Sequence, residues 1–434
     1  MRFTERQTIV DFLGQLRAHN VHISLAATGG GARIQGLLWD LPGASSYLGS
    51  SFFSYPPEET DTVAGFHLKA YATPQTAQHL AMMMYLKSCQ VLETRMRRLE
   101  QTIEREDSLD LLRYTAETQP IGIGVAASVA SERIHRGDHR LNIAVMTHDK
   151  FQVTSLILSK DAGYAAREYD GELCDITALN ALAHAMDFDQ MPMYEMTRVV
   201  GDCAPNVSLK GQPLGLTPKN LDEKEARELF LSLPYFSPTG ARMPAIPTGG
   251  YNLVPVTGRP LHEGHEGMAQ RLEDHTGKRS IFVVATNVPP GYSKSLPSVQ
   301  DLLSRAAMVR SSNQLNNTER GIFFSKSCLF VDMAKEHPGA GIAVGADALL
   351  RAFDPQWCGG LENTRSMFME VADKGTSFFV FDRKQQGDNV LTGDVVLAQS
   401  YKFLDPMIAI ALVKPLRGRW DISSTDIRMR RGLE

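Results

Sequence analysis

Two histidines three residues apart mark the part of the chain best suited to chemistry. His262 and His265 follow an apolar segment, and Gly264 lies between them. Two side chains at this spacing at the start of a helix face the same side, and a glycine leaves room for a phosphate to approach the backbone amides. Imidazoles beside a helix N-terminus can donate hydrogen bonds to phosphate oxygens whose negative charge grows in a transition state. Isolated histidine pairs are more often structural, so the pattern requires a second signal.

That second signal lies near the C-terminus. Ser423, Ser424 and Thr425 form a hydroxyl cluster suited to capping a helix, and Arg428 follows one turn later. Hydroxyl groups, free backbone amides and a guanidinium group would there converge on one anion site, which suits a triphosphate. Taken alone, the segment is more typical of a well-capped last helix.

Together, the two motifs resemble the HxGH and ISSTxxR signatures of the nucleotidyltransferase superfamily. This superfamily includes nicotinamide and nicotinate mononucleotide adenylyltransferases, phosphopantetheine adenylyltransferase and cytidylyltransferases. The resemblance covers about residues 250–434, and residues 344–349 also resemble the GADxL segment of the pyridine mononucleotide branch. It implies that the phosphate of an acceptor attacks the α-phosphate of ATP and that pyrophosphate leaves, without a nucleophilic side chain.

The resemblance also implies roles for individual residues. The implied catalytic residues are His262, His265 and Arg428. The implied nucleotide-binding residues are Thr257, Gly264, Lys294, Gly345, Asp347, Ser423, Ser424 and Thr425. Mg²⁺ is implied by the triphosphate chemistry, bound together with the ATP substrate and with few dedicated protein ligands.

The segment before the histidines departs from the superfamily pattern. Gly258 stands where an aromatic residue is usual, and Arg259 stands where a small amide side chain is usual. Arg259 could add a phosphate contact or alter the choice of acceptor. The resemblance therefore defines the class of reaction better than it defines the acceptor.

The elements that must position these residues alternate between strands and helices. Residues 251–258, 280–288 and 341–346 have the apolar composition of buried strands, and helical segments such as 299–310 separate them. This order predicts a Rossmann-like, doubly wound parallel sheet. Ligands of such sheets bind beyond the carboxyl ends of the strands, where the histidine pair would lie.

The first half of the chain has a similar α/β pattern. Apolar strands such as 121–130 lie between helical segments, which indicates an α/β domain with both sheet faces covered. Residues 28–30, 40–46 and 53–55 resemble the signature of the C-terminal domain of the CinA family, which includes nicotinamide mononucleotide deamidases. This resemblance covers about residues 5–190.

The catalytic residues of the CinA family are replaced in this sequence. Leu25, Ala26 and Ala27 stand where Glu, Ser and Cys are expected, and Thr60 stands where a lysine is expected. A hydroxyl nucleophile needs a base to activate it, and both the serine and the lysine are missing. We therefore expect a catalytically degenerate domain that does not deamidate.

These patterns predict two α/β domains joined by a connector. The boundaries are a CinA-like domain at residues 1–190, a connector at 191–248 and a nucleotidyltransferase domain at 249–434. The connector is rich in proline and glycine around one short helical segment, which indicates a partly ordered link. An irregular extension packed onto one domain is an equally good interpretation.

Composition limits the classes of function. With 434 residues, of which 43% are hydrophobic, most of the chain can fold. The 45 basic and 49 acidic side chains give a net charge of −4, which would not attract nucleic acid or an anionic membrane. Five scattered cysteines without a CxxC pair exclude a disulfide framework and suit a reducing compartment. No apolar run approaches the roughly 18 residues that span a bilayer, so we expect a cytoplasmic protein.

The leading hypothesis is an ATP-dependent nucleotidyltransferase that transfers an adenylyl group to a pyridine mononucleotide or a similar acceptor. Its expected partners are ATP and a phosphorylated small molecule, with no nucleic acid and no membrane, and any homo-oligomer would form through the N-terminal domain. One alternative is a nucleotide-binding pseudoenzyme with a regulatory or scaffold role. Another is a bifunctional enzyme that combines nicotinamide mononucleotide deamidation with adenylyl transfer.

Overall fold

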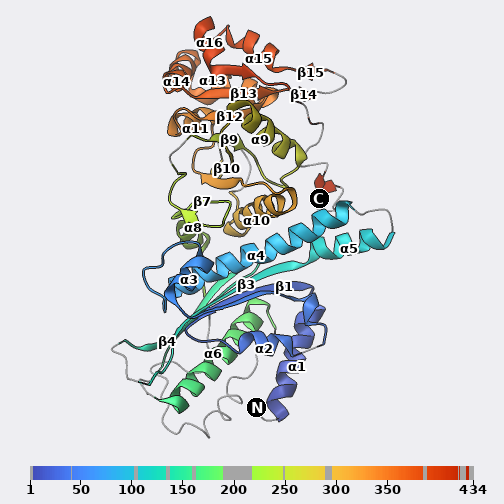
Figure 1. The fold of residues 1–434 in the computed structure, drawn as a ribbon, viewed down its shortest axis with the longest axis vertical. Helices are drawn as coiled ribbons and strands as arrows, with labels where there is room; N and C mark the ends of the chain where they lie inside the picture. Colours follow the sequence, from blue (N-terminus) through green and yellow to red (C-terminus); the bar gives the residue numbers. More distant parts are fainter. Residues whose placement is uncertain are drawn as a thin grey trace. The chain divides into compact units, whose positions relative to one another are not determined.

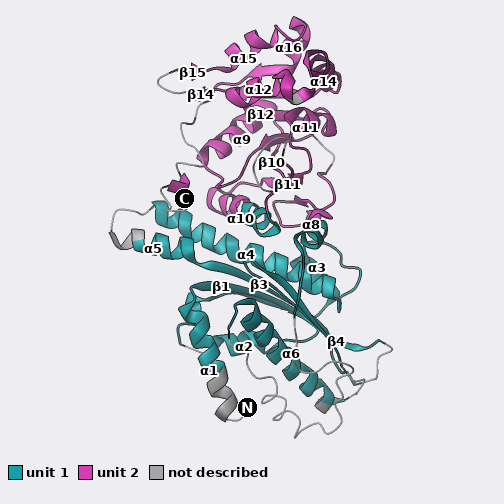
Figure 2. Cartoon of the chain, turned by 180° about the vertical axis from the view of Figure 1, so that it is seen from behind, with its two compact units in different colours: residues 1–230, 298–307 teal, residues 231–297, 308–434 magenta. Residues whose placement is uncertain are grey.

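The computed structural model folds into two units. It describes residues 3–40, 42–101, 106–132, 137–158, 163–188, 218–247, 250–288, 296–384, 389–418, 420 and 427–429. Unit 1 comprises residues 1–230 and 298–307, and unit 2 comprises residues 231–297 and 308–434 (Figure 2). Each unit contains one large sheet, so the expected two-domain α/β fold is confirmed.

Unit 1 is built on a six-stranded mixed sheet with the strand order β2-β1-β3-β4-β5-β6. The strands are β1 (Val21–Thr28), β2 (Leu48–Ser54), β3 (Gln119–Ser128), β4 (His139–Met146), β5 (Phe151–Leu158) and β6 (Lys219–Asn220). Strand β1 runs parallel to both β2 and β3, whereas β4, β5 and β6 each run antiparallel to their neighbours.

Helices cover both faces of this sheet, as the sequence predicts. The helices of unit 1 are α1 (Phe3–Ala18), α2 (Ile34–Trp39), the 3-10 helix η1 (Ala44–Ser46), α3 (Pro57–Ala64), α4 (Pro74–Gln101), α5 (Glu106–Glu117), α6 (Tyr164–Ala185) and α8 (Glu223–Leu231). Helix α4 lies along one face, and α1, α2 and α6 lie on the other, where their apolar residues join those of the strands in one core (Figure 1).

The helix α4 approaches β3 so closely that only glycine fits between them. A Cβ atom on Gly122 would lie 2.8 Å from the Cα atom of Tyr85, and one on Gly124 would lie 2.9 Å from the Cβ atom of Leu80. Contacts this short would force the helix away from the sheet. The alternating glycines of β3 therefore determine how α4 packs.

A histidine is buried beneath the same helix. His22 of β1 is 2% exposed, and its Nδ1 lies 2.6 Å from the hydroxyl oxygen of Ser88 in α4. Burial, together with the positive charge of Arg95, lowers the pKa of His22 to about 4. The folded protein therefore keeps this imidazole neutral at pH values where an exposed histidine would be protonated.

This buried histidine makes stability depend on pH. The unfolded chain binds the proton near pH 6.5 and the folded chain only near pH 4, so stability is greatest above pH 6.5 and falls as the pH falls below it. Between about pH 7 and about pH 5, we expect His22 to lower the free energy of unfolding by about 2 kcal/mol. Urea unfolding of the wild type and of His22→Gln at both pH values measures this. Equal pH dependence in the two proteins would contradict the assignment.

Unit 2 contains an eight-stranded sheet with the order β16-β13-β12-β9-β10-β11-β7-β8. Its strands are β7 (Tyr235–Phe236), β8 (Arg242–Met243), β9 (Asn252–Pro255), β10 (Ser280–Ala285), β11 (Gly321–Ser325), β12 (Gly341–Gly345), β13 (Ser377–Phe381) and β16 (Val413–Pro415). Six of these strands run parallel to one another, namely β16, β13, β12, β9, β10 and β11. Strands β7 and β8 are antiparallel additions at the edge beside β11.

The parallel strands confirm the expected doubly wound arrangement. Starting from β9, the chain first adds β10 and β11 on one side and then returns to add β12, β13 and β16 on the other. This is the Rossmann-type order, and its direction reverses between β9 and β12. Loops at the carboxyl ends of these two strands therefore flank the place where such folds bind ligands.

Helices and one small hairpin complete unit 2. The helices after β8 are α9 (Glu263–Thr276), α10 (Val299–Asn316), α11 (Phe330–Glu336), α12 (Ala346–Ala352), α13 (Pro355–Cys358), α14 (Leu361–Asp373), α15 (Gly393–Ser400) and α16 (Pro406–Leu412). Residues 299–307 of α10 belong to unit 1, and residues 308–316 belong to unit 2. A separate antiparallel pair consists of β14 (Arg383–Lys384) and β15 (Val390–Leu391). In the described part of the chain, no helix is both long and apolar enough to cross a bilayer.

Part of the expected connector is ordered and extends both sheets. Residues 189–217 and 248–249 lie outside the described part of the chain. Of the remainder, β6 pairs with β5 in unit 1, and β7 pairs with β11 in unit 2. The described connector residues thus contribute strands to each unit.

Candidate functional site

The histidine pair lies at the start of α9, just beyond the carboxyl end of β9. His262 is the N-cap residue of the helix, and its Nδ1 accepts a hydrogen bond from the backbone amide of Gly264 at 3.2 Å. The Nδ1 of His265 accepts a hydrogen bond from the backbone amide of His262 at 3.4 Å. The two imidazoles thereby form a reciprocal capping box, a role usually taken by hydroxyl and carboxylate side chains.

These caps determine which ring nitrogen carries the proton. A backbone amide can only donate, so each Nδ1 is unprotonated and each neutral ring carries its proton on Nε2. Burial is the main cause that lowers the pKa of His265 to about 3, with further contributions from the neighbouring His262 and Arg383, so this ring is neutral at physiological pH. The two rings stack with their centroids 3.8 Å apart. The pair therefore presents two neutral Nε2–H donors side by side.

Gly264 supports the histidines in a way that differs from the sequence argument. Its amide already donates to His262, and a Cβ atom at this position would lie 3.0 Å from the imidazole of His262 and 3.2 Å from the Cβ atom of Trp420. The space beside this glycine is thus occupied by two side chains of the protein. In this structure the absence of a side chain at Gly264 leaves room for the side chains of His262 and Trp420.

Trp420 packs against the first turns of α9. A Cβ atom on Gly267 would overlap the six-membered ring of the indole and lie 2.7 Å from its nitrogen, Nε1. On its other side the indole contacts the end of β13, because its ring centroid lies 5.9 Å from that of Phe381. Trp420 immediately precedes residues 421–426, which contain the predicted hydroxyl motif and lie outside the described part of the chain.

Arg428 reaches the loop that precedes the histidines. Its Nη1 donates a 2.9 Å hydrogen bond to the carbonyl oxygen of Arg259, and the peptide bond between Arg259 and Pro260 is cis. Gly258, in the same loop, has a φ of 65°. A side chain is strained in this left-handed region, which explains why glycine replaces the usual aromatic residue here. Thr257 also lies in this loop and is exposed.

Gly345 and Asp347 lie on the strand next to the histidine loop. Gly345 ends β12 and is the N-cap of α12, and Asp347 lies in the first turn of that helix. The carboxylate of Asp347 pairs with Arg351 at 2.9 Å. Because β12 and β9 are parallel neighbours, these residues lie at the same edge of the sheet as the histidine pair.

The structure thus places seven of the predicted site residues in three segments: the loop after β9, the start of α12 and the C-terminal turn. They are Thr257, His262, Gly264, His265, Gly345, Asp347 and Arg428. Lys294, Ser423, Ser424 and Thr425 lie outside the described residues.

Two residues at this site were not found by sequence reasoning. Trp420 packs against the first turns of α9, and the charge of Arg383 is one of the causes of the lowered pKa of His265. A signal for Trp420 was present, because a glycine within a helix costs about 1 kcal/mol relative to alanine. Gly267 inside α9 therefore indicated that another group approaches the helix at that point.

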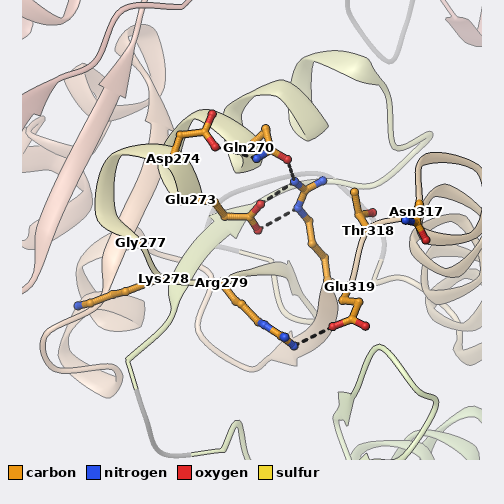
Figure 3. Close-up of a pocket in the computed structure, with 10 residues that line it drawn as sticks. Gln270, Glu273, Asp274, Gly277, Lys278, Arg279, Asn317, Thr318 and Glu319 are labelled. Atoms are coloured by element: carbon orange, nitrogen blue, oxygen red, sulfur yellow. Dashed lines mark hydrogen bonds and ion pairs between the residues drawn. The ribbon is translucent and has the colours of Figure 1, made fainter.

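A surface depression at the opposite edge of the sheet carries no comparable chemistry. It measures about 360 Å³ and lies where β10 and β11 begin (Figure 3). Arg320 donates to both carboxylate oxygens of Glu273, at 3.0 and 2.7 Å, and Arg279 pairs with Glu319 at 3.0 Å. Because the charged groups satisfy one another, the depression is best explained as a structural ion-pair network.

In unit 1, the segment compared with the CinA family forms a buried hydroxyl cluster. The hydroxyl oxygen of Thr60 lies 3.2 Å from that of Thr28 and 3.0 Å from that of Ser54. All three side chains are buried. These groups satisfy one another's hydrogen-bonding capacity in the interior.

Comparison with known families supports the assignment of unit 2. A family model described as cytidylyltransferase-like matches residues 259–430, which include the histidine pair, the Gly345 segment and Arg428. No curated protein matches the chain. The match supports the nucleotidyltransferase superfamily for this region and a nucleotidyltransferase activity in general.

Proposed function

We propose that the chain is an ATP-dependent nucleotidyltransferase that transfers an adenylyl group to a pyridine mononucleotide or a similar phosphorylated acceptor. The observation that carries the proposal is the capped pair of His262 and His265. Their two Nε2–H groups lie where the sheet reverses direction, within the region that matches the cytidylyltransferase-like family. The acceptor and the use of ATP come from the sequence resemblance.

The proposed reaction is a direct displacement at phosphorus. An oxygen of the acceptor phosphate forms a bond to the α-phosphorus of ATP while the bond from that phosphorus to the α,β-bridging oxygen breaks. The electron pair of that bond leaves with pyrophosphate. The two Nε2–H groups would donate to α- and β-phosphate oxygens as their negative charge grows, and because the caps already hold them in place, little reorganisation is needed.

The remaining predicted residues complete the proposed site. Arg428, Ser424 and Thr425 would hold the β- and γ-phosphates, and Lys294 would supply a further cation. Ser423 would help to cap the helix that carries Arg428, and Thr257 would support the approaching phosphates. Gly345 and Asp347, at the end of β12, would line the ribose and the acceptor.

Magnesium enters this proposal as part of the substrate. Among the described residues, no group of three histidine, cysteine or carboxylate side chains could hold a metal ion. Mg²⁺ in enzymes of this chemistry is commonly held by phosphate oxygens and water with few protein ligands. The ion would neutralise charge on the triphosphate that it accompanies.

A panel of acceptors tests the proposal. Nicotinamide mononucleotide, nicotinate mononucleotide, phosphopantetheine and phosphocholine are each incubated with the protein and either ATP or CTP, and pyrophosphate is measured. We expect release that requires both ATP and an acceptor and that is fastest with a pyridine mononucleotide. Binding of ATP without pyrophosphate release for any acceptor would instead identify a nucleotide-binding protein without this activity.

For unit 1 we predict no deamidase activity. Thr60 occupies the place of the expected lysine and hydrogen-bonds within the buried hydroxyl cluster. We therefore expect no release of ammonia from nicotinamide mononucleotide, measured with a coupled ammonia assay in the presence and absence of ATP. Ammonia release that the purified protein catalyses would establish the bifunctional alternative.

A further inference from the structure

Arg383 lies at the same edge of the sheet as the histidine pair. It follows β13 directly, two residues after Phe381, which pairs with Gly345 at the end of the neighbouring β12. Its positive charge is one of the influences that lower the pKa of His265. Arg383 therefore belongs to the candidate site by position, although neither motif contains it.

The backbone of Arg383 is held firmly. Arg383 pairs with Leu391 across the antiparallel β14–β15 hairpin. The preceding carboxylate, that of Asp382, accepts a 3.0 Å hydrogen bond from the amide of Gly393 at the start of α15. Gly393 is itself tightly packed, because a Cβ atom there would lie 2.9 Å from the carbonyl oxygen of Val380. The backbone that carries this cation is thus fixed in position.

The charge of Arg383 is not balanced by a carboxylate in the described part of the chain. Three other arginines of unit 2 pair with acids: Arg320 with Glu273, Arg351 with Asp347 and Arg365 with Glu362. Arg383 forms no such pair with any described residue, and it is partly buried.

Of the acidic residues near the site in sequence, Glu263 is exposed, whereas Asp382 and Glu266 have hydrogen-bond partners. Asp382 accepts from Gly393, and Glu266 hydrogen-bonds to Ser312 and Asn316. A partly buried arginine at the same edge of the sheet as two neutral imidazoles fits an anionic ligand, since arginine binds phosphate oxygens with two parallel hydrogen bonds.

We propose that Arg383 is a phosphate-binding residue of this site, and that it provides the positive charge that the two neutral histidines do not. This inference rests on the proposed function, because it assigns Arg383 to the polyphosphate of the nucleoside triphosphate. The histidines donate hydrogen bonds near the reacting phosphorus, and Arg383 compensates the charge that accumulates on the departing pyrophosphate. Its contribution should therefore scale with the number of phosphates on the ligand.

Binding measurements without an acceptor test this role. We compare Arg383→Gln, Arg383→Lys and the control Lys384→Gln, which changes the adjacent exposed residue. Equilibrium dialysis measures Kd for ATP and for AMP, which lacks the two outer phosphates. We expect Arg383→Gln to weaken ATP binding about tenfold to hundredfold, Arg383→Lys to weaken it less, and AMP binding to change by less than about threefold. Lys384→Gln should change neither.

A second measurement uses inorganic tripolyphosphate as a competitor of ATP. Inorganic tripolyphosphate should displace ATP from the wild type and should do so less effectively from Arg383→Lys. Unchanged ATP binding in Arg383→Gln, or equal weakening of ATP and AMP, would overturn the assignment of Arg383. A different result would contradict the proposed function without bearing on Arg383: the wild type would bind ATP but transfer nothing to any acceptor.

Discussion

Replacement of His265 by asparagine is expected to lower kcat for nucleotidyl transfer by about 100- to 1,000-fold with little loss of stability. The side-chain oxygen of asparagine lies as many bonds from Cα as Nδ1 of histidine does, so it can still accept from the amide of His262. The variant keeps the helix cap but loses the Nε2–H donor. Steady-state kinetics and urea unfolding measure the two effects separately.

Glutamine at the same position is the matched control. Its amide nitrogen lies as many bonds from Cα as Nε2 of histidine does, so His265→Gln should recover part of the lost rate while it weakens the cap. If the asparagine variant retained the wild-type rate, the donor role of His265 would be wrong. If both variants lost activity only in proportion to lost stability, capping alone would explain the residue.

Replacement of Gly267 by alanine is expected to lower kcat/KM by about 100-fold or more, because small displacements of phosphate-binding groups have effects of this size. The new methyl group would overlap the indole of Trp420 and force it off α9. We expect displacement of Trp420 to move Arg428, eight residues later in the chain, although alanine favours the helix itself. Kinetics with ATP and tryptophan fluorescence measure activity and displacement together.

Gly171 in α6 provides the control for this substitution. It also lies within a helix, and a Cβ atom there would meet nothing within 4 Å. Gly171→Ala should leave activity unchanged. Because Gly267 and Trp420 act through one contact, the double variant Gly267→Ala with Trp420→Ala should be no less active than Trp420→Ala alone. Wild-type kinetics for Gly267→Ala would show that Trp420 does not position the site.

The order of the elements and the place of the site follow from local patterns. Short apolar runs separated by helical segments predict the parallel sheet of unit 2, and a histidine pair directly after one of them predicts a site at the carboxyl edge. Both predictions are local in sequence, since β9 and His262 are separated by only a few residues. The sheet order confirms this arrangement.

What sequence patterns missed depends on contacts between distant segments. Trp420 and Gly267 lie far apart in the chain, and nothing in either local segment shows that they touch. The same holds for Arg383, which comes to the same edge of the sheet as the histidines because β13 lies beside β12. The sequence also could not show why a glycine stands at position 264, because the side chains that fill the space beside it are those of His262 and the distant Trp420.

The fate of each phosphate of ATP tests the central claim most directly. The protein is incubated with nicotinamide mononucleotide and ATP labelled with ³²P at either the α- or the γ-position, and the products are separated by chromatography. The account predicts that the α-label appears in a dinucleotide joined to the acceptor and the γ-label in pyrophosphate, and that a double variant with asparagine at His262 and His265 forms neither. Transfer of the γ-label to the acceptor, or its release as orthophosphate with no α-labelled dinucleotide, would contradict it.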